Sequence, residues 1–203
     1  MATLKDVAER VGVSITTVSR VLTAAIEEVC YKIGYKLFFC TSGGHPDRER
    51  ELFSSLRGNN VAGVLVCSRI TDASLYTNMD VPMVSIERTI EDVPSVSCDN
   101  YKGGVLAAQE LLLSGCKAPM LFGNRIVSKN LPAELRYQGF RDACAKAGKP
   151  CSEYYISDYC AISTVARPIR QMGELAVDLL IKRINGHMIR QMRVLSLTEP
   201  IPA

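Results

Sequence analysis

The chain has 203 residues, of which 47% are hydrophobic and 22% are charged, and its formal net charge is +3. This composition is ordinary for a globular protein and excludes a disordered chain, a collagen-like rod and a coiled-coil rod. At about 150 residues for a typical domain, the length allows one large domain or one and a half ordinary ones. No apolar run approaches the roughly 20 residues that span a bilayer, and no basic and apolar signal segment opens the chain. We therefore expect a cytoplasmic protein.

Charge and cysteine content limit the kinds of site that the chain can carry. The first 23 residues hold three basic and two acidic side chains, so binding to nucleic acid would depend on a few placed groups instead of bulk charge. The eight cysteines form no CxxC pair and have no metal-ligand spacing with the two histidines. We expect most of them to be small buried side chains, and we predict no metal and no cofactor.

Two short helices are predicted at the N-terminus. Thr3 begins a capping-box pattern, and the apolar residues at helical spacing from Leu4 stop before Gly12. Ser14 is a good N-cap for a second helix that continues through Leu22. Two helices joined by a short glycine-containing turn form a helix-turn-helix, although the spacing alone also fits an ordinary helical hairpin. The outer face of the second helix carries hydroxyl groups and one guanidinium, which suit phosphates and guanine: Ile15, Thr16, Thr17, Ser19 and Arg20.

The same segment resembles a known family. TLKDVA (3–8), GVS (12–14) and TVSRVL (17–22) resemble the N-terminal signature of lactose-repressor (LacI/GalR) transcription regulators. The resemblance implies a DNA-binding unit over residues 1–23, with Ile15, Thr16 and Arg20 facing base edges in the major groove. It also implies contacts with the DNA backbone from Ser14, Thr17, Ser19 and either Thr3 or Leu4.

From residue 24 onward, short apolar runs alternate with amphipathic stretches. Continuous apolar runs predict strands buried on both faces, at 36–40, 63–67, 83–86, 95–98 and 119–122. Helices are predicted at 25–33, 46–57, 100–114 and 133–147, several of them followed by glycine: Gly34, Gly58, Gly115 and Gly148. Alternation of this kind predicts an α/β body with a doubly wound parallel sheet.

The family resemblance extends across this body. Its landmarks include the segments 25–35, 46–51, 61–66, 99–104 and 136–140, and residues 167–186 resemble the family's last long helix. The resemblance implies a core over residues 24–203 like that of periplasmic sugar-binding proteins, with two α/β lobes, doubly wound parallel sheets and a small effector, commonly a sugar or nucleobase, held between them. The predicted fold is thus an all-α helix-turn-helix followed by an incomplete two-lobed core.

Effectors in such sheets bind at the carboxyl ends of the strands. The match to the family's Arg-x-x-Gly-Phe motif implies that Arg136 is the principal effector ligand, although it also fits a residue of a surface ion pair. Ser68, Arg88 and Asp99 each follow a predicted strand and are candidates to line the site.

The chain departs from the family's pattern at two places. The second helix of the predicted helix-turn-helix meets the body at residues 22–25. At this place the family has a third helix and a hinge helix that enters the DNA minor groove. The body's first strand, expected before Ala25, and several elements of the second lobe are also absent. Either the sequence joins pieces of a longer polypeptide, or the chain is a deletion product. A measured mass equal to 22.3 kDa would exclude the first explanation.

These features predict a DNA-binding transcriptional regulator of the repressor type, controlled by a small effector such as a sugar. The partners implied are a pseudo-palindromic operator in double-stranded DNA and a second copy of the chain, with no membrane. An enzyme is not expected, because the sequence holds no phosphate-binding glycine loop and no Gly-x-Ser-x-Gly motif. A sugar-binding module of the periplasmic type, without DNA activity, is the alternative.

Overall fold

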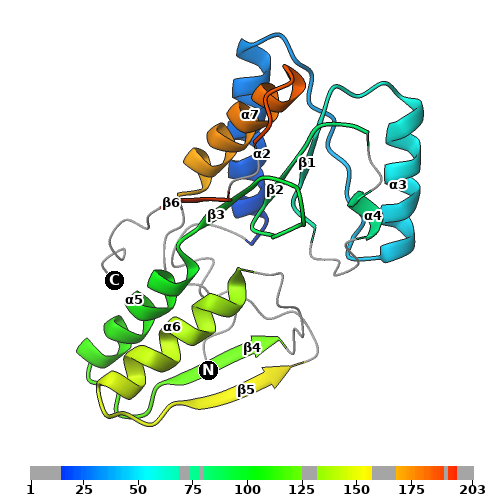
Figure 1. Cartoon of the computed structure of the whole chain (residues 1–203). Helices are drawn as coiled ribbons and strands as arrows, with labels where there is room; N and C mark the ends of the chain where they lie inside the picture. Colours follow the sequence, from blue (N-terminus) through cyan, green and yellow to red (C-terminus); the bar gives the residue numbers. More distant parts are fainter. Residues whose placement is uncertain are drawn as a thin grey trace. The chain divides into compact units, whose positions relative to one another are not determined.

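A computed structural model of the chain describes residues 15–68, 74–77, 80–124, 132–156, 168–189 and 192–195. These residues form two compact units. The described residues of the first unit lie within 15–97 and 169–194, and those of the second within 98–168 and at 195; both units are drawn in Figure 1. Across the ranges given above, no helix is long and apolar enough to cross a membrane. The predicted first helix of the helix-turn-helix lies outside the described residues, as do Thr3, Leu4 and Ser14.

Helix α2 (Ile15–Lys32) is continuous over 18 residues. The sequence predicts two separate helices here, and the structure joins them, because neither glycine nor proline interrupts residues 15–33. The helix ends at Gly34, whose φ of 80° lies in the left-handed region. Tyr35 N–H donates to the Cys30 carbonyl at 2.8 Å, and Gly34 N–H donates to that of Tyr31 at 3.1 Å. This pair of hydrogen bonds is a Schellman ending, as the position of Gly34 predicts.

Helix α7 (Ile169–Ile184) packs along α2 in the first unit, as Figure 1 shows in orange and blue. Their approach is close because a glycine lies at the crossing. A Cβ added at Gly173 would lie 3.3 Å from both Ala25 Cβ and Ile26 Cγ1, which is tighter than ordinary van der Waals contact.

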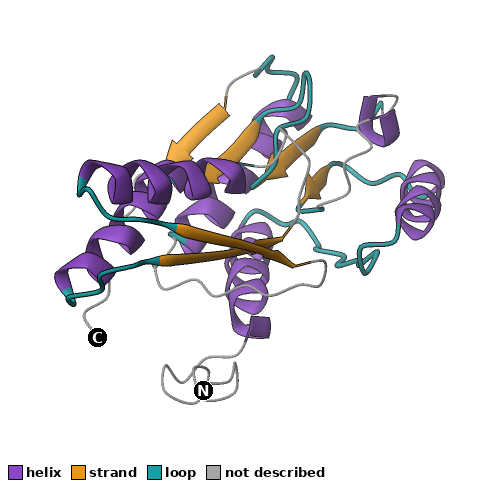
Figure 2. Cartoon of the chain, turned by 90° about the horizontal axis from the view of Figure 1, so that it is seen from below, coloured by secondary structure: helices purple, strands orange, loops and turns teal. Residues whose placement is uncertain are grey.

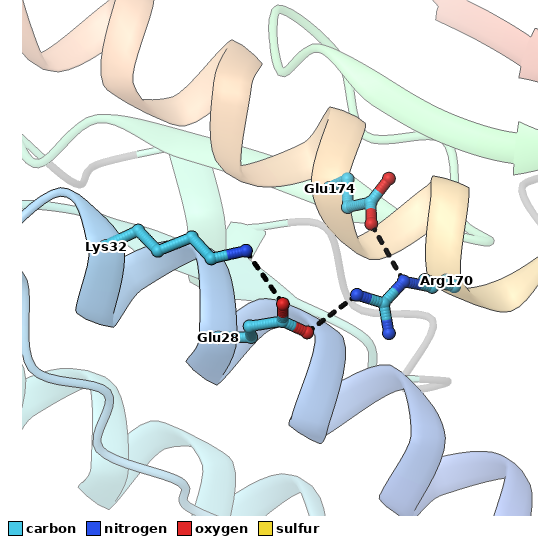
Figure 3. Close-up of polar contacts among 4 residues, drawn as sticks. All are labelled: Glu28, Lys32, Arg170 and Glu174. Carbon is cyan, nitrogen blue, oxygen red and sulfur yellow. Dashed lines mark hydrogen bonds and ion pairs between the residues drawn. The ribbon is translucent and has the colours of Figure 1, made fainter.

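An exposed ion-pair network joins the same two helices (Figure 3). The Glu28 carboxylate accepts hydrogen bonds from Lys32 at 2.7 Å and from Arg170 at 2.6 Å, and Arg170 also donates to Glu174 at 3.0 Å. Lys32 and then Arg170 hold the pKa of the Glu28 carboxyl below its ordinary value. Of these three contacts, the Glu28–Arg170 pair is the one that crosses from one helix to the other.

The first unit contains a four-stranded sheet in the order β1-β2-β3-β6. Its strands are β1 (Val64–Val66), β2 (Met83–Ile86), β3 (Ser95–Cys98) and β6 (Met192–Leu195). The pairs β1–β2 and β2–β3 are parallel, and every residue of β2 and β3 is buried. The predicted parallel sheet is confirmed for these three strands, whereas β6 was not predicted from the sequence.

Helices α3 (Pro46–Gly58) and α4 (Ser74–Thr77) complete the first unit. A hydrophobic cluster connects them to the sheet, and the rings of Phe53 and Tyr76 meet edge to face with their centroids 5.1 Å apart. The sequence predicts that Gly58 follows this helix, but Gly58 is its last residue and Asn59 is the C-cap. Asn59 ends the helix by donating its side-chain amide to the Ser55 carbonyl at 2.7 Å.

The prediction of a strand at residues 36–40 is wrong. Residues 35–42 form an irregular segment without strand pairing, which Figure 2 draws as loop. Phe38 is 79% exposed and Phe39 is 67% exposed. An apolar run forms a buried strand only when a neighbouring strand accepts its hydrogen bonds, and no strand among the described residues pairs with this run. The expectation that most cysteines are buried is also wrong. Of the seven that the structure describes, Cys98 and Cys144 are buried, three are half-buried, and Cys40 and Cys67 are exposed.

The second unit contains two helices and two parallel strands: α5 (Asn100–Leu113), β4 (Met120–Asn124), α6 (Ala133–Lys146) and β5 (Ser152–Ile156). Strands β4 and β5 pair in parallel on either side of α6 in the sequence, which makes a strand-helix-strand unit. Its core is formed by Ala108, Leu121, Phe140 and Cys144. Helices α5 and α6 end at Gly115 and Gly148 with the hydrogen-bond pattern seen at Gly34, as predicted.

Candidate functional site

Two of the predicted effector residues meet at the carboxyl ends of β1 and β2. Because these strands are parallel and in register, with Val66 beside Ser85, the residues that follow them emerge at the same edge of the sheet. Arg88 Nη1 donates a hydrogen bond to the Ser68 carbonyl at 3.2 Å. A hydrogen bond also fixes the backbone at Arg88, because Ser85 Oγ donates to the Arg88 carbonyl at 2.7 Å.

Arg88 is buried with its hydrogen-bonding capacity mostly unused. The residue is 1% exposed, and its guanidinium carbon lies 4.8 Å from the centroid of the Tyr76 ring, in a cation–π contact. Within the described part of the chain, Arg88 Nε and Nη2 are buried and have no hydrogen-bond partner. Each unsatisfied buried donor costs about 1–3 kcal/mol, and more for a charged group, so this arrangement is unfavourable unless a further group accepts from the guanidinium.

A buried carboxylate contacts the same two residues, Ser68 and Tyr76, that hold this arginine. Glu49, on α3, is 3% exposed. Its Oε2 accepts hydrogen bonds from Ser42 Oγ at 2.9 Å and from Ser68 Oγ at 2.7 Å, and its Oε1 accepts one from the Tyr76 hydroxyl. Burial, and next the hydrogen bond to Glu49, raise the pKa of Tyr76 to about 12. Tyr76 therefore stays protonated and donates to the carboxylate throughout the physiological range.

The second unit holds Arg136 beside the start of α5. Arg136 Nη2 donates to Asn100 Oδ1 at 2.5 Å, and Asn100 Nδ2 donates to the Cys98 carbonyl at 3.1 Å. Arg136 is partly buried, and Asn100 is 2% exposed. A fixed amide therefore orients the guanidinium that the sequence motif singles out.

Two glycines allow this contact by bringing α5 and α6 together. A Cβ at Gly104 would lie 1.9 Å from the Arg136 carbonyl oxygen, and one at Gly139 would lie 2.1 Å from that of Tyr101. Neither distance is possible for real atoms, so only glycine permits the backbones to pass this closely. The backbone of Arg136 thus lies against the first turns of α5, within reach of Asn100.

Asp99 has a local structural role. Its Oδ1 accepts a hydrogen bond from Lys102 N–H at 2.9 Å, which makes it the N-cap of α5. Asp99 does follow β3 as predicted, and its part in effector binding stays a prediction.

The predicted DNA-contacting residues can be placed only in part. Ile15, Thr16, Thr17, Ser19 and Arg20 lie in the first turns of α2, where the structure describes the helix and not their side chains. Their contacts with DNA, and the separate unit over residues 1–23, stay predictions.

Sequence reasoning missed three residues of these clusters: Glu49, Tyr76 and Asn100. Asn100 could have been found, because it follows Asp99 directly after a buried strand. Glu49 and Tyr76 are 27 positions apart in the chain, and neither belongs to a recognisable motif. Only the folded chain brings them to Arg88.

Comparisons with known proteins identify relatives with named functions. A sucrose operon repressor of Streptococcus mutans is 33% identical over 123 residues, which cover 60% of this chain and 38% of the relative. A ribose operon repressor of Bacillus subtilis is 35% identical over 91 residues, covering 45% and 28% respectively. The chain thus spans less than half the length of these curated relatives.

A third relative bears on the absent segments. The sucrose operon repressor of Lactococcus lactis is 30% identical over 229 aligned positions, covering 83% of this chain and 71% of the relative. The alignment is longer than the 203 residues of this chain, so the relative has residues with no counterpart here. This agrees with the elements that the family pattern contains and this sequence lacks.

Solved structures share the fold. The Cra regulator of Pseudomonas putida, in complex with fructose 1-phosphate, superposes with a TM-score of 0.79 at 16% identity, covering 92% of this chain and 95% of that one. A periplasmic binding protein/LacI regulator of Alkaliphilus metalliredigens, complexed with D-xylulofuranose, gives 0.76 at 21% identity, covering 87% and 90%. The periplasmic-binding-protein-like fold expected from the sequence is therefore confirmed.

A sequence profile described as "periplasmic binding proteins and sugar binding domain of LacI family" matches residues 16–185. The match covers most of the chain, including both units and every candidate effector residue. The chain therefore belongs to the family of periplasmic binding proteins and LacI-type sugar-binding domains.

Proposed function

We propose that the chain belongs to a transcriptional regulator, a repressor whose affinity for operator DNA is controlled by a small molecule, and that residues 24–203 form its effector-binding core. The observation that carries the effector site is Arg88. A guanidinium that is 1% exposed, with Nε and Nη2 unpartnered, is costly in the folded chain alone and is relieved by a ligand that offers two acceptors.

We propose that this ligand is a sugar or a sugar phosphate. Nε and Nη2 belong to one planar group and suit two neighbouring oxygens, as on vicinal hydroxyls or a phosphate. The relatives that repress the sucrose and ribose operons support a carbohydrate. Arg136, whose guanidinium Asn100 orients, is a further candidate ligand, as are Ser68 and Asp99.

DNA binding is proposed for residues 1–23. Ile15, Thr16 and Arg20 would read base edges, while Ser14, Thr17, Ser19 and Thr3 or Leu4 would contact phosphates. A homodimer on a pseudo-palindromic operator would match two such units to two half-sites. Any coupling to the effector is reciprocal, so operator DNA must change the effector's affinity by the same factor as the effector changes that of DNA.

Effector binding is tested by thermal shift and calorimetry with sucrose, D-ribose and fructose 1-phosphate, with a nucleobase as the contrasting class. A true effector raises the melting temperature with its concentration, as mass action requires. Arg136→Ala should abolish the response and leave the fold intact. Unchanged affinity in that variant would remove Arg136 from the site.

Gel shifts at two salt concentrations separate a repressor from the alternative, a sugar-binding module without DNA activity. A repressor loses affinity steeply as salt rises and keeps its preference for the operator. A sugar-binding module shows neither behaviour. Binding of a sugar without any shift of operator DNA would decide for the module.

A further inference from the structure

We propose that Glu49 is a positioning residue: through Tyr76 and Ser68 it fixes the guanidinium of Arg88 in the orientation that leaves Nε and Nη2 free for a ligand. This inference rests on the proposed role of Arg88 in effector binding. No part of the sequence pattern points to Glu49.

Glu49 ties together three segments that are far apart in the chain. Its carboxylate accepts hydroxyl hydrogen bonds from Ser42 before α3, from Ser68 after β1 and from Tyr76 on α4. A carboxylate that is 3% exposed has lost its water and depends on these donors. The three hydroxyls are therefore held in one arrangement.

Two of the three donors also hold Arg88. The Tyr76 ring lies under the guanidinium at 4.8 Å, and the Ser68 carbonyl accepts from Nη1 at 3.2 Å. Among the described contacts, Glu49 makes no hydrogen bond with Arg88 itself. Its effect on the arginine is thus indirect: it fixes the Tyr76 ring and the Ser68 residue whose carbonyl accepts from Arg88.

A purely structural explanation for this cluster is weak. Glu49 lies beside the hydrophobic cluster that contains Phe53 and Tyr76, where an apolar side chain of similar volume would stabilise the fold as well or better. The polar cluster costs desolvation energy, and the arrangement that it produces is a buried guanidinium with two unused donors. Two free donors on a fixed guanidinium can bind a ligand, and this role explains why a carboxylate is buried at position 49.

The positioning is tested without any ligand, by NMR of arginine Nε–H groups in the full chain. The signal of Arg88 is assigned by its absence in Arg88→Met. In Glu49→Gln, which keeps the shape and removes the charge, the Arg88 signal should shift and broaden. Glu51→Gln, an exposed change on the same helix, is the matched control and should leave the signal in place.

A second variant covers the case in which Glu49→Gln fails to fold. Tyr76→Phe removes one hydroxyl and keeps the ring under Arg88, so it should move the same signal in the same direction by less. An unchanged Arg88 signal in folded Glu49→Gln, or in Tyr76→Phe if the first variant is unfolded, would overturn the proposal.

Binding of sucrose and D-ribose then separates this inference from the proposed function. For whichever sugar binds the unaltered chain, Glu49→Gln should weaken binding about tenfold, the scale of one lost hydrogen bond to a charged group. The same change in an Arg88→Lys background should cost little more. Equal weakening in both backgrounds would overturn the positioning role, because the effect would then not pass through Arg88. If the NMR signal moves and neither sugar binds, the positioning stands and the sugar effector is wrong.

Discussion

Arg88→Met separates the function of the site from the stability of the fold. The substitution removes a charge that is 1% exposed and keeps a flexible side chain of comparable length. It abolishes one hydrogen bond to the Ser68 carbonyl and one cation–π contact with Tyr76. It also removes two buried donors, Nε and Nη2, that have no partner among the residues the structure describes.

The opposing contributions are similar in size. The lost hydrogen bond to a charged donor is worth about 1.5–3 kcal/mol, and the desolvated cation–π contact about 2 kcal/mol. Relief of two unsatisfied donors returns about 2–6 kcal/mol. The free energy of unfolding of Arg88→Met should therefore lie within about 1 kcal/mol of that of the unaltered chain. Binding of a sugar that uses both donors should fall about a hundredfold or more, since two charged hydrogen bonds amount to about 3 kcal/mol at least.

Urea denaturation measures the first quantity and calorimetry the second. Arg50→Met is the control, because Arg50 is an exposed arginine on α3 and should affect neither stability nor sugar binding appreciably. A stability loss of about 3–5 kcal/mol in Arg88→Met would refute the reasoning. It would mean that the unliganded fold already satisfies this charge.

Three further predictions concern other parts of the molecule. Gly104→Ala places a methyl group 1.9 Å from a carbonyl oxygen on α6, so it should lower the free energy of unfolding by about 3 kcal/mol in urea titrations, and an unchanged midpoint would contradict the close helix crossing. Arg170 lowers the pKa of the Glu28 carboxyl, and this pair therefore contributes stability above the ordinary pKa of 4.5 that is lost as the pH falls through the lowered value. Arg170→Met removes this partner, so the contribution of Glu28 to stability should shrink. The free energy of unfolding of Arg170→Met should then fall less steeply between neutral pH and pH 3 than that of Lys182→Met, which breaks an ion pair within α7 alone. Equal slopes in the two variants would contradict a stabilising ion pair between Glu28 on α2 and Arg170 on α7. Arg20→Ala should cost about 1–3 kcal/mol of operator binding and relax specificity at one base pair, whereas uniform weakening across operator variants would make Arg20 a phosphate contact.

The elements that could be predicted are those whose pattern is set by their own residues. Strands β2 and β3 are continuous apolar runs and are buried as such runs predict. Helices α3, α5 and α6 follow from their apolar spacing and their terminal residues, whereas α7 was expected only because residues 167–186 resemble the family's last long helix. The run at 36–40 is also mostly apolar but forms no strand, because the partner that it needs is not supplied by the described chain.

The residues of the candidate site also divide into those that local sequence predicts and those that depend on tertiary packing. Ser68, Arg88 and Asp99 could be placed because residues that follow parallel strands emerge at a predictable edge. Whether such a residue faces a ligand or a backbone amide depends on tertiary structure, and Asp99 in fact caps α5. The contacts of Glu49 with Tyr76 depend on how α3 and α4 pack, which no local pattern encodes.

The most direct test of the central claim is a crystal structure of the chain with the sugar that binds it most tightly among sucrose, D-ribose and fructose 1-phosphate. The account predicts two sugar or phosphate oxygens within about 3 Å of Arg88 Nε and Nη2, the ordinary distance of a hydrogen bond. A sugar bound elsewhere, with Nε and Nη2 still unpartnered, would contradict it.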